Sequence, residues 1–350
     1  MGERKQIPTK SSYANTPLIK RQSSFGGRSR EANVSGGKSK IDQPHSVQLL
    51  IDRGYEVLDK VGIGNYSTVF RVRSTTKREM AVKIIEMEKV SKNYKFRFLP
   101  RELEIIAKLK HENIIKVYAI QTTHRYCYIF MEFAPNGTLG DFIRRNGAIP
   151  EWMAKPLMLQ IANALHYLHA SGIAHRDVKL ENIMLDKFQN PKLTDFSYSL
   201  VCLRDPTTGN FAINKTFCGS LPYMPPEILK TPYDPKASDI WSLGVCLFII
   251  LNDRVPFRFN DIMAMVKSQL AREWAFKGHI KEATSEECKD LVNRMLDPNQ
   301  ATRITAIQIT EHPWFQKSPP STPTTASLTK SKPATGSEGG VNPTKSSNQT

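Results

Sequence analysis

The sequence has few cysteines, and no two of them are spaced as metal ligands. Five cysteines are scattered over 350 residues, and no C-x-x-C motif occurs. An odd number of widely separated cysteines argues against a disulfide framework and against a structural zinc site. Thiols of this kind are typical of a reducing compartment, so a cytoplasmic protein is expected.

Long hydrophobic runs are also missing. The longest, from Leu243 to Leu251, is too short to cross the roughly 30 Å of a bilayer's hydrocarbon core, and it predicts a buried helix instead. No secretory signal peptide is recognisable, and Met1-Gly2 is followed by Gln6 where a myristoylation motif requires Ser or Thr. We therefore expect neither a membrane span nor a lipid anchor.

Compact runs of basic residues are absent, although the net charge is +16. Part of this excess lies at the two ends of the chain and part in its middle. A basic balance suits acidic partners such as nucleotides, phosphoproteins, microtubules or nucleic acid, and does not choose among them. Nucleic-acid binding is not expected without a basic arm, whereas salt-sensitive binding of polyanions by the ends remains an alternative.

The ends of the chain differ from the middle in composition. Residues 1–52 and 316–350 are rich in small, polar and basic residues without periodicity, so both are expected to be disordered tails. Between them, apolar alternation predicts strands within 55–87 and at 128–133, and helical spacing predicts helices at 98–110, 152–170, 237–251 and 285–296. This order predicts an α+β fold with a β-rich lobe, 53–132, before a helical lobe, 137–315.

Two glycines lie in a turn between predicted strands, in the segment Gly62-Ile-Gly64-Asn-Tyr-Ser67. Such a turn lets backbone N–H groups close over phosphates, although an ordinary hairpin has the same composition. Lys83 on the next strand and Glu102 on the following helix could form an ion pair that contacts those phosphates. Either residue alone is more often a solvated charge.

The most informative segment is His175-Arg-Asp-Val-Lys-Leu-Glu-Asn182, with Asp195-Phe-Ser beginning thirteen residues after it. Asp177 can accept the proton of an attacking hydroxyl, and Lys179 can neutralise a transferring phosphoryl group. Asn182 and Asp195 are suitable oxygen ligands for Mg²⁺. Because Asp177 supplies the base, we expect His175 to be a packed core residue.

Residues 54–315 resemble a eukaryotic protein kinase domain of the calmodulin-kinase-like group. Within this group the chain is most similar to the testis-specific serine kinases, through R-F-L-P-R-E-L-E-I, L-R-D with K-T-F-C-G-S, and Y-D-P-K-x-x-D-I-W-S-L-G-V. The resemblance implies a bilobal fold. It also implies transfer of the γ-phosphoryl group of Mg-ATP to serine or threonine of protein substrates, by a monomeric catalytic domain.

The resemblance also implies a role for each matching residue. Lys83 and Glu102 become the ion pair of the active state, and Asp177 and Lys179 act on the hydroxyl and the phosphoryl group. ATP and Mg²⁺ are the cofactors, with Asn182 and Asp195 as metal ligands. The nucleotide would contact Val61, Gly62, Gly64, Ser67, Val69, Ala81, Lys83, Met131, Glu132, Phe133 and Met184, with Met131 as gatekeeper and Glu132 and Phe133 giving backbone bonds to adenine.

Further roles follow from the activation segment of the resembled kinases. Glu227 and Arg303 would form a buried pair, and Asp239 would hold the catalytic loop. Thr216, eleven residues before Glu227, would be phosphorylated by an upstream kinase or by autophosphorylation. Its phosphate would pair with Arg176, although a local hydrogen bond of Thr216 is the alternative.

The chain departs from the kinase pattern at a few positions. Ser197 replaces the usual glycine after Asp-Phe, and Ser67 replaces the third glycine of the turn. These two changes leave a pseudokinase, a nucleotide-binding scaffold without catalysis, as the alternative function. Thr138 and Ile249 occupy positions where relatives that prefer basic substrates carry glutamate, so such a preference is not expected.

Overall fold

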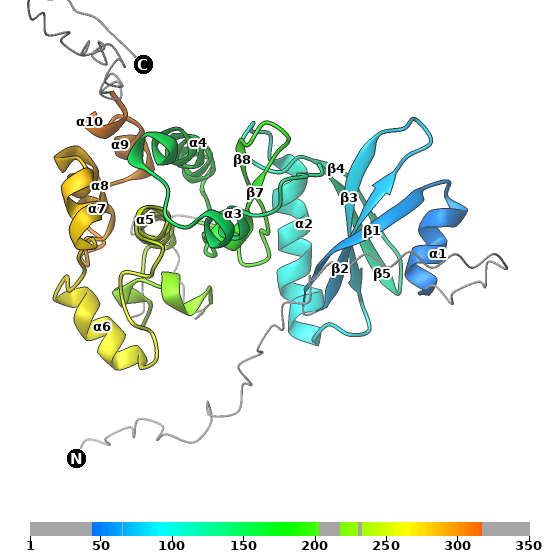
Figure 1. The fold of residues 1–350 in the computed structure, drawn as a ribbon. Helices are drawn as coiled ribbons and strands as arrows, with labels where there is room; N and C mark the ends of the chain where they lie inside the picture. Colours follow the sequence, from blue (N-terminus) through cyan, green and yellow to red (C-terminus); the bar gives the residue numbers. More distant parts are fainter. Residues whose placement is uncertain (1–43, 65, 203–217, 230–232, 317–350) are drawn as a thin grey trace, which may run out of the picture. The chain divides into compact units, whose positions relative to one another are not determined.

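The computed structural model describes residues 44–64, 66–202, 218–229 and 233–316. The first part is a five-stranded antiparallel sheet in the order β1-β2-β3-β5-β4 (Figure 1). Its strands are β1 (Glu56–Ile63), β2 (Ser67–Arg73), β3 (Glu79–Glu86), β4 (Val117–Thr122) and β5 (Tyr126–Met131). The strands predicted within 55–87 are confirmed as β1, β2 and β3, and the strand predicted at 128–133 is confirmed as β5, which ends at Met131; β4 was not predicted.

Alternating side chains give this sheet two apolar faces. On one face, Ile85 and Ile129 belong to the main hydrophobic core together with apolar residues of helix α2 (Leu99–Lys108). On the other, Ile84 and Tyr128 pack with Leu50 of helix α1 (His45–Asp52). Figure 1 shows α1 and α2 on opposite sides of the sheet.

Helix α1 corrects the expected boundary of the N-terminal tail. Residues 45–52 are helical, and Val47 and Leu50 are 3% and 0% exposed. The hydroxyl of Tyr128 also donates to the carbonyl oxygen of Ser46 at 3.1 Å. A helix of eight residues is marginal in isolation, so the contacts with the sheet stabilise it. At the other end, Gln316, where the second tail was expected to begin, is the last residue of helix α10 (Pro313–Gln316). The rest of the expected tails, residues 1–43 and 317–350, lies outside the described part of the chain.

The second part is mainly helical. Three predicted helices are confirmed as α4 (Glu151–Ala170), α5 (Pro235–Asn252) and α8 (Glu286–Met295). Helix α5 contains the apolar run that begins at Leu243 and is buried on nearly every side, as expected for a helix without a polar face. The shorter helices are α3 (Leu139–Asn146), α6 (Ile262–Leu270), α7 (Gly278–Ala283), α9 (Ala306–Thr310) and α10 (Pro313–Gln316).

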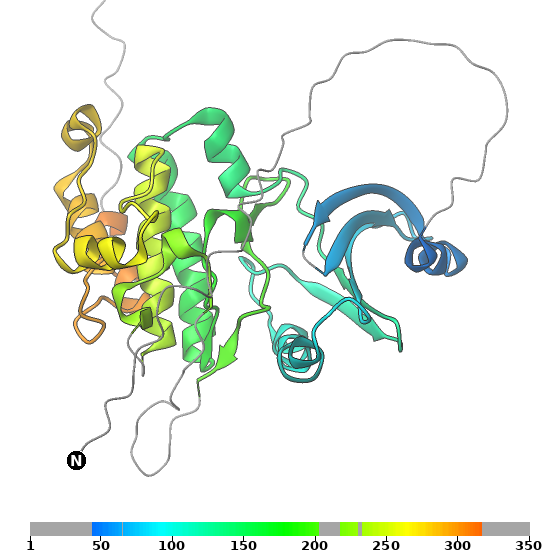
Figure 2. The same ribbon diagram turned by 90° about the horizontal axis from the view of Figure 1, so that it is seen from below.

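Short strand pairs support the loops between the two parts. Strand β6 (Ile173–Ala174) pairs with β9 (Leu200–Val201), and β7 (Ile183–Leu185) pairs with β8 (Pro191–Leu193). Figure 2 shows the sheet, in blue and cyan, beside the green to orange helical part from a second direction. Single helical turns occur at η1 (Tyr94–Phe98), η2 (Leu180–Asn182), η3 (Leu221–Tyr223) and η4 (Pro226–Leu229).

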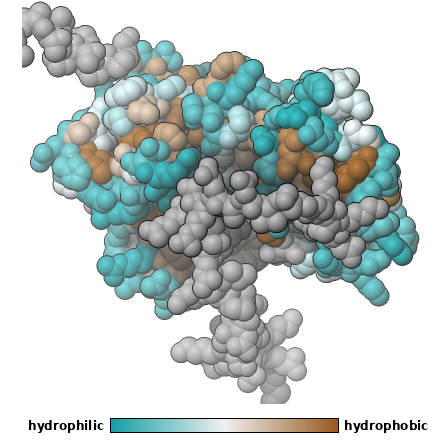
Figure 3. Space-filling model, turned by 45° about the vertical axis from the view of Figure 1, so that its right-hand side comes forward, coloured by the Kyte–Doolittle hydropathy of each residue, from teal (hydrophilic) through white to brown (hydrophobic). Residues whose placement is uncertain are grey.

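One face of the molecule carries mainly polar side chains where it is described (Figure 3). Figure 3 shows a face on which hydrophilic side chains predominate and apolar residues form small patches between them. No helix of the described residues has the length and apolar character that crossing a bilayer requires.

Candidate active site

In the turn between β1 and β2, backbone groups of Gly64 and Ser67 lie close together. The N–H of Gly64 donates to the carbonyl oxygen of Ser67 at 2.7 Å. A Cβ atom built on Gly64 would lie only 2.8 Å from Oγ of Ser67, so a larger residue would require the Ser67 hydroxyl to move, whereas the nearest backbone atom, the carbonyl oxygen of Ser67, is 3.7 Å away. Gly62 lies opposite Val69 in the strand register. Val61, in β1, is 43% exposed.

The strand register brings the expected adenine-contacting residues to one face of the sheet. Val69 lies opposite Lys83, and Ala81 lies opposite Met131. Because residues two apart on a strand point to the same side, Ala81 and Lys83 share this face. Met184 comes from β7 and forms an isolated bridge with Thr138.

Lys83 forms ion pairs with two carboxylates from distant parts of the chain. Its Nζ lies 3.2 Å from Oε1 of Glu102 on α2 and 3.5 Å from Oδ1 of Asp195. Burial alone would lower the pKa of Lys83, but Glu102 and Asp195 outweigh it and raise that pKa above its ordinary value. The lysine is therefore held in its charged form.

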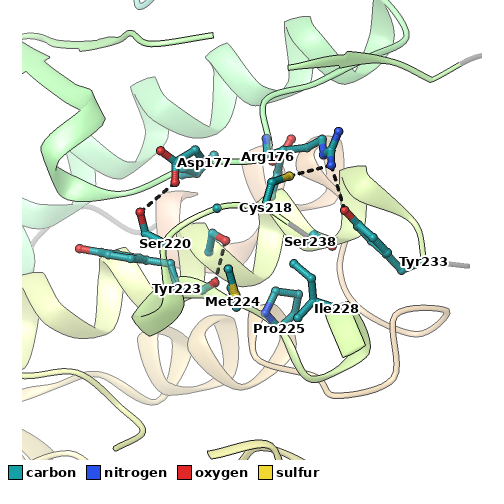
Figure 4. Close-up of a pocket in the computed structure, with 14 residues that line it drawn as sticks. Arg176, Asp177, Cys218, Ser220, Tyr223, Met224, Pro225, Ile228, Tyr233 and Ser238 are labelled. Atoms are coloured by element: carbon teal, nitrogen blue, oxygen red, sulfur yellow. Dashed lines mark hydrogen bonds between the residues drawn. The ribbon is translucent and has the colours of Figure 1, made fainter. Parts of the chain in front are cut away.

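Asp177 is almost fully buried and receives hydrogen bonds from several side chains. Lys179 Nζ lies 2.6 Å from its Oδ2, and Ser220 Oγ donates to its Oδ1 at 3.0 Å. Asn182 Nδ2 donates to Oδ2 at 2.9 Å. These contacts fix the orientation of a carboxylate whose side chain is 3% exposed. Figure 4 shows Ser220 directed at Asp177.

Asn182 and Asp195 offer oxygen atoms suitable for a hard divalent cation. The amide nitrogen of Asn182 donates to Asp177, which leaves the amide oxygen as its remaining ligand atom. Within the described residues, no three His, Cys, Asp or Glu side chains form a metal cluster. One carboxylate and one amide fit Mg²⁺, which is usually completed by water and substrate phosphates.

Asp195 and the two residues after it are held by an unusual backbone angle, by packing and by a hydrogen bond. Asp195 has a φ of 64°, and Phe196 is 4% exposed against the ring of His175. Burial would raise the pKa of Asp195, but Lys83 and a hydrogen bond from Ser197 outweigh it and lower that pKa. Ser197 is not among the described residues with positive φ, so its backbone does not require glycine here.

The expected supporting residues lie as predicted. Asp239 accepts from the backbone N–H groups of Arg176 and His175 at 2.7 and 2.8 Å. His175 is fully buried, which confirms its prediction as a packed residue. Glu227 and Arg303 form a buried pair with distances of 2.6 and 2.9 Å.

Comparison with known families agrees with this geometry. Residues 55–315 match the model of the protein kinase domain. The chain belongs to the protein kinase family. The predicted α+β kinase fold is therefore confirmed.

The relatives of this kinase include several testis-specific enzymes. It is 40% identical over 283 residues to testis-specific serine/threonine-protein kinase 2 of Mus musculus, covering 80% of the chain and 78% of that relative. It is 38% identical to testis-specific serine/threonine-protein kinase 3 of Mus musculus, covering 76% of the chain and 98% of the relative. CBL-interacting protein kinase 31 of Oryza sativa subsp. japonica is 34% identical, with 75% and 58% covered. The predicted resemblance is confirmed.

In this kinase the segment after β5 is tied to both of its neighbours. The N–H of Glu132 donates to the carbonyl oxygen of Lys116 at 2.8 Å, so this N–H is not free to bind a ligand. The carboxylate of Glu132 lies 2.9 Å from Nζ of Lys192 on β8. The guanidinium of Arg71 lies over the ring of Phe133, 5.4 Å from its centre.

Sequence patterns missed some residues around the site. Tyr94 donates to Glu102, and Tyr94 belongs to none of the motifs that identified the site. Arg101 on α2 lies near Arg176, and burial together with Arg176 and Arg97 lowers the pKa of Arg101. The motif R-F-L-P-R-E shows that Arg101 is positively charged, but it does not show which residues surround Arg101. Thr216 lies outside the described residues.

Proposed function

We propose that this chain is a serine/threonine protein kinase that transfers the γ-phosphoryl group of Mg-ATP to hydroxyl groups of protein substrates. The observation that carries this proposal is that two groups of paired side chains are joined where the N–H of Thr194, the residue before Asp195, donates to the carbonyl oxygen of Asn182 at 2.9 Å. Lys83 pairs with Glu102 and Asp195, while Asp177 is bonded to Lys179, Ser220 and Asn182.

Each of these residues has a role in the transfer. Asp177 accepts the proton of the attacking hydroxyl and orients that oxygen toward the phosphorus. Lys179, 2.6 Å from Asp177, neutralises charge on the moving phosphoryl group. Lys83 binds the α- and β-phosphates and is held by Glu102. Asn182 and Asp195 hold Mg²⁺, which when bound neutralises the phosphate oxygens.

The adenine site is proposed on the sheet face around Ala81. Val69 and Ala81 cover one side of the purine and Met184 the other. Met131 limits the depth of the site as gatekeeper. The carbonyl of Glu132 accepts from the adenine amino group, and Phe133 contributes backbone after it. The turn of Val61, Gly62, Gly64 and Ser67 covers the phosphates.

Serine and threonine are proposed as acceptors for two reasons. Several relatives are named as serine/threonine kinases. Lys179 also bonds Ser220 Oγ at 2.8 Å while Ser220 donates to Asp177, which supports a complete serine/threonine catalytic loop. All five cysteines are free thiols, which supports a reducing compartment such as the cytoplasm.

We also propose that phosphorylation of Thr216 activates the kinase. A phosphate carries about −2 charge and would pair with Arg176, which precedes Asp177. Arg101 supports this site for two reasons. The charge of Arg176 contributes to lowering the pKa of Arg101. The buried Nε of Arg101 also has no hydrogen-bond partner among the described residues. An anion would relieve this repulsion. Thr216→Ala and phosphatase-treated protein should lose activity equally, and full activity in both would contradict the proposal.

The function is tested with γ-labelled ATP and peptide libraries whose acceptor is serine, threonine or tyrosine. Label is expected on serine and threonine libraries only. Lys83→Met and Asp195→Ala should each remove transfer, and Asp195→Ala should also weaken Mg-ATP binding. Binding of ATP without transfer by the wild type would favour the scaffold alternative.

A further inference from the structure

The carboxylate of Glu102 makes a second contact that the kinase motifs do not contain. One oxygen, Oε1, lies 3.2 Å from Nζ of Lys83. The other, Oε2, accepts a hydrogen bond from the hydroxyl of Tyr94 at 2.9 Å. Glu102 is 3% exposed, so water has little access to either oxygen. The two donors therefore occupy opposite ends of one buried carboxylate.

The backbone before α2 places Tyr94 at this position. Residues Tyr94–Phe98 form a π-helical turn, in which the N–H of Leu99 donates to the carbonyl oxygen of Tyr94. The N–H of Tyr94 donates to Oγ of Ser91 at 3.2 Å, which fixes the start of the turn. Single π-helical turns are rare and are frequent at functional sites.

We propose that Tyr94 is a positioning residue for phosphoryl transfer, whose hydroxyl holds the carboxylate of Glu102 so that Oε1 faces Lys83. This inference rests on the proposed role of Lys83 at the ATP phosphates. A hydrogen bond to a buried charge is stronger than one between neutral groups, and losing it leaves an acceptor unsatisfied. Without Tyr94, the carboxylate can rotate away from Lys83.

The hydroxyl of Tyr94 remains a donor under ordinary conditions. Burial, followed by the negative charge of Glu102, raises the pKa of Tyr94 well above its usual value. The phenol is thus protonated at any pH at which the kinase works. The bond to Glu102 does not depend on a titration near neutrality.

Tyr94 also contacts the turn proposed to cover the phosphates. Its ring centre lies 6.3 Å from that of Tyr66, which follows Gly64 in the turn. The carbonyl oxygen of Tyr66 accepts from the N–H of Glu86 at the end of β3. Tyr94 therefore touches two elements of the ATP site, one through its hydroxyl and the other through its ring. Substituting phenylalanine removes only the first contact.

The test is a double-mutant cycle with Tyr94→Phe, Glu102→Ala and both together. In the wild-type background, Tyr94→Phe should lower kcat/KM for ATP by about tenfold, the scale of one lost bond to a buried charge. In the Glu102→Ala background it should have almost no effect, because the acceptor is gone. Tyr55→Phe is the matched control, since Tyr55 packs on Phe130 on the opposite face of the sheet.

A structural role alone would give a different pattern. An equal loss from Tyr94→Phe in both backgrounds, or no loss in either, would overturn the inference. If Glu102→Ala is too slow to assay, ATP affinities of the same proteins are compared by calorimetry, with several-fold weakening by Tyr94→Phe expected only when Glu102 is present. An inactive wild type would contradict the proposed function instead, and the affinity cycle would still decide the role of Tyr94.

Discussion

Replacing Arg303 by methionine should destabilise the kinase by about 3–5 kcal/mol, because the substitution leaves a buried carboxylate without its partner. Arg303 and Glu227 are 4% and 6% exposed, and two of their atom pairs lie 2.6 and 2.9 Å apart. Arg303 also donates to the carbonyl oxygens of Asp297 and Ala237, both at 2.8 Å. Methionine fills part of the volume but replaces none of these bonds.

This loss is measured by urea unfolding followed by tryptophan fluorescence. Trp241 is a suitable reporter, because the guanidinium of Arg303 lies 5.1 Å from its ring centre. In thermal unfolding, the same loss should lower the melting temperature by roughly 6–20 °C, at roughly 2–4 °C per kcal/mol for a domain of this size. Removing both charges with Arg303→Met and Glu227→Met should cost much less than the single change.

The matched control is Arg294→Met, which breaks an ion pair on the surface. Arg294 lies 2.9 Å from Asp290, but their side chains are 59% and 46% exposed. Such pairs contribute about 0–1 kcal/mol. If Arg303→Met and Arg294→Met had equal effects, the reasoning from burial would be refuted.

Three other changes test separate parts of the structure. A chain that begins at Gly54 should have a melting temperature several degrees below that of a chain that begins at Pro44. Burying Val47 and Leu50 stabilises the fold by about 1.5–3 kcal/mol each, from which the entropy cost of ordering α1 is subtracted. Equal melting temperatures would mean that α1 adds no stability. Ser197→Gly should change activity by less than about tenfold, since the present backbone does not need glycine, and a gain near a hundredfold would favour the pseudokinase reading. Ser220→Ala should lower kcat, because it removes one hydrogen-bond donor from Asp177. It should leave ATP affinity unchanged, because Ser220 is not proposed to contact the nucleotide. An unchanged kcat would contradict the role of Ser220 in orienting Asp177.

Much of the candidate site could be predicted because its chemistry is written in local spacing. Asp177, Lys179 and Asn182 lie within six residues, and the structure joins them by hydrogen bonds. Alternation along a strand also puts Ala81 and Lys83, which are two residues apart, on one face of the sheet. In both cases the spacing of the residues along the chain determines how close their side chains lie.

The features that were missed depend on contacts between distant residues. Helix α1 has too few residues to be stable alone and forms against Tyr128, which is far away in the sequence. The contact of Tyr94 with Glu102 requires a π-helical turn, which has no composition signal. The bond between Glu132 and Lys116 depends on how two strands end. None of these follows from periodicity or motif spacing.

The central claim is tested most directly by comparing wild type with Asp177→Asn in transfer of labelled γ-phosphate to a serine peptide. Asparagine keeps the shape of the side chain but cannot act as a base. The rate should fall by roughly 10²–10⁴-fold, while ATP affinity and melting temperature remain near those of the wild type. Equal transfer rates in the two proteins, with both folded and bound to ATP, would contradict the assignment of Asp177 and the mechanism built on it.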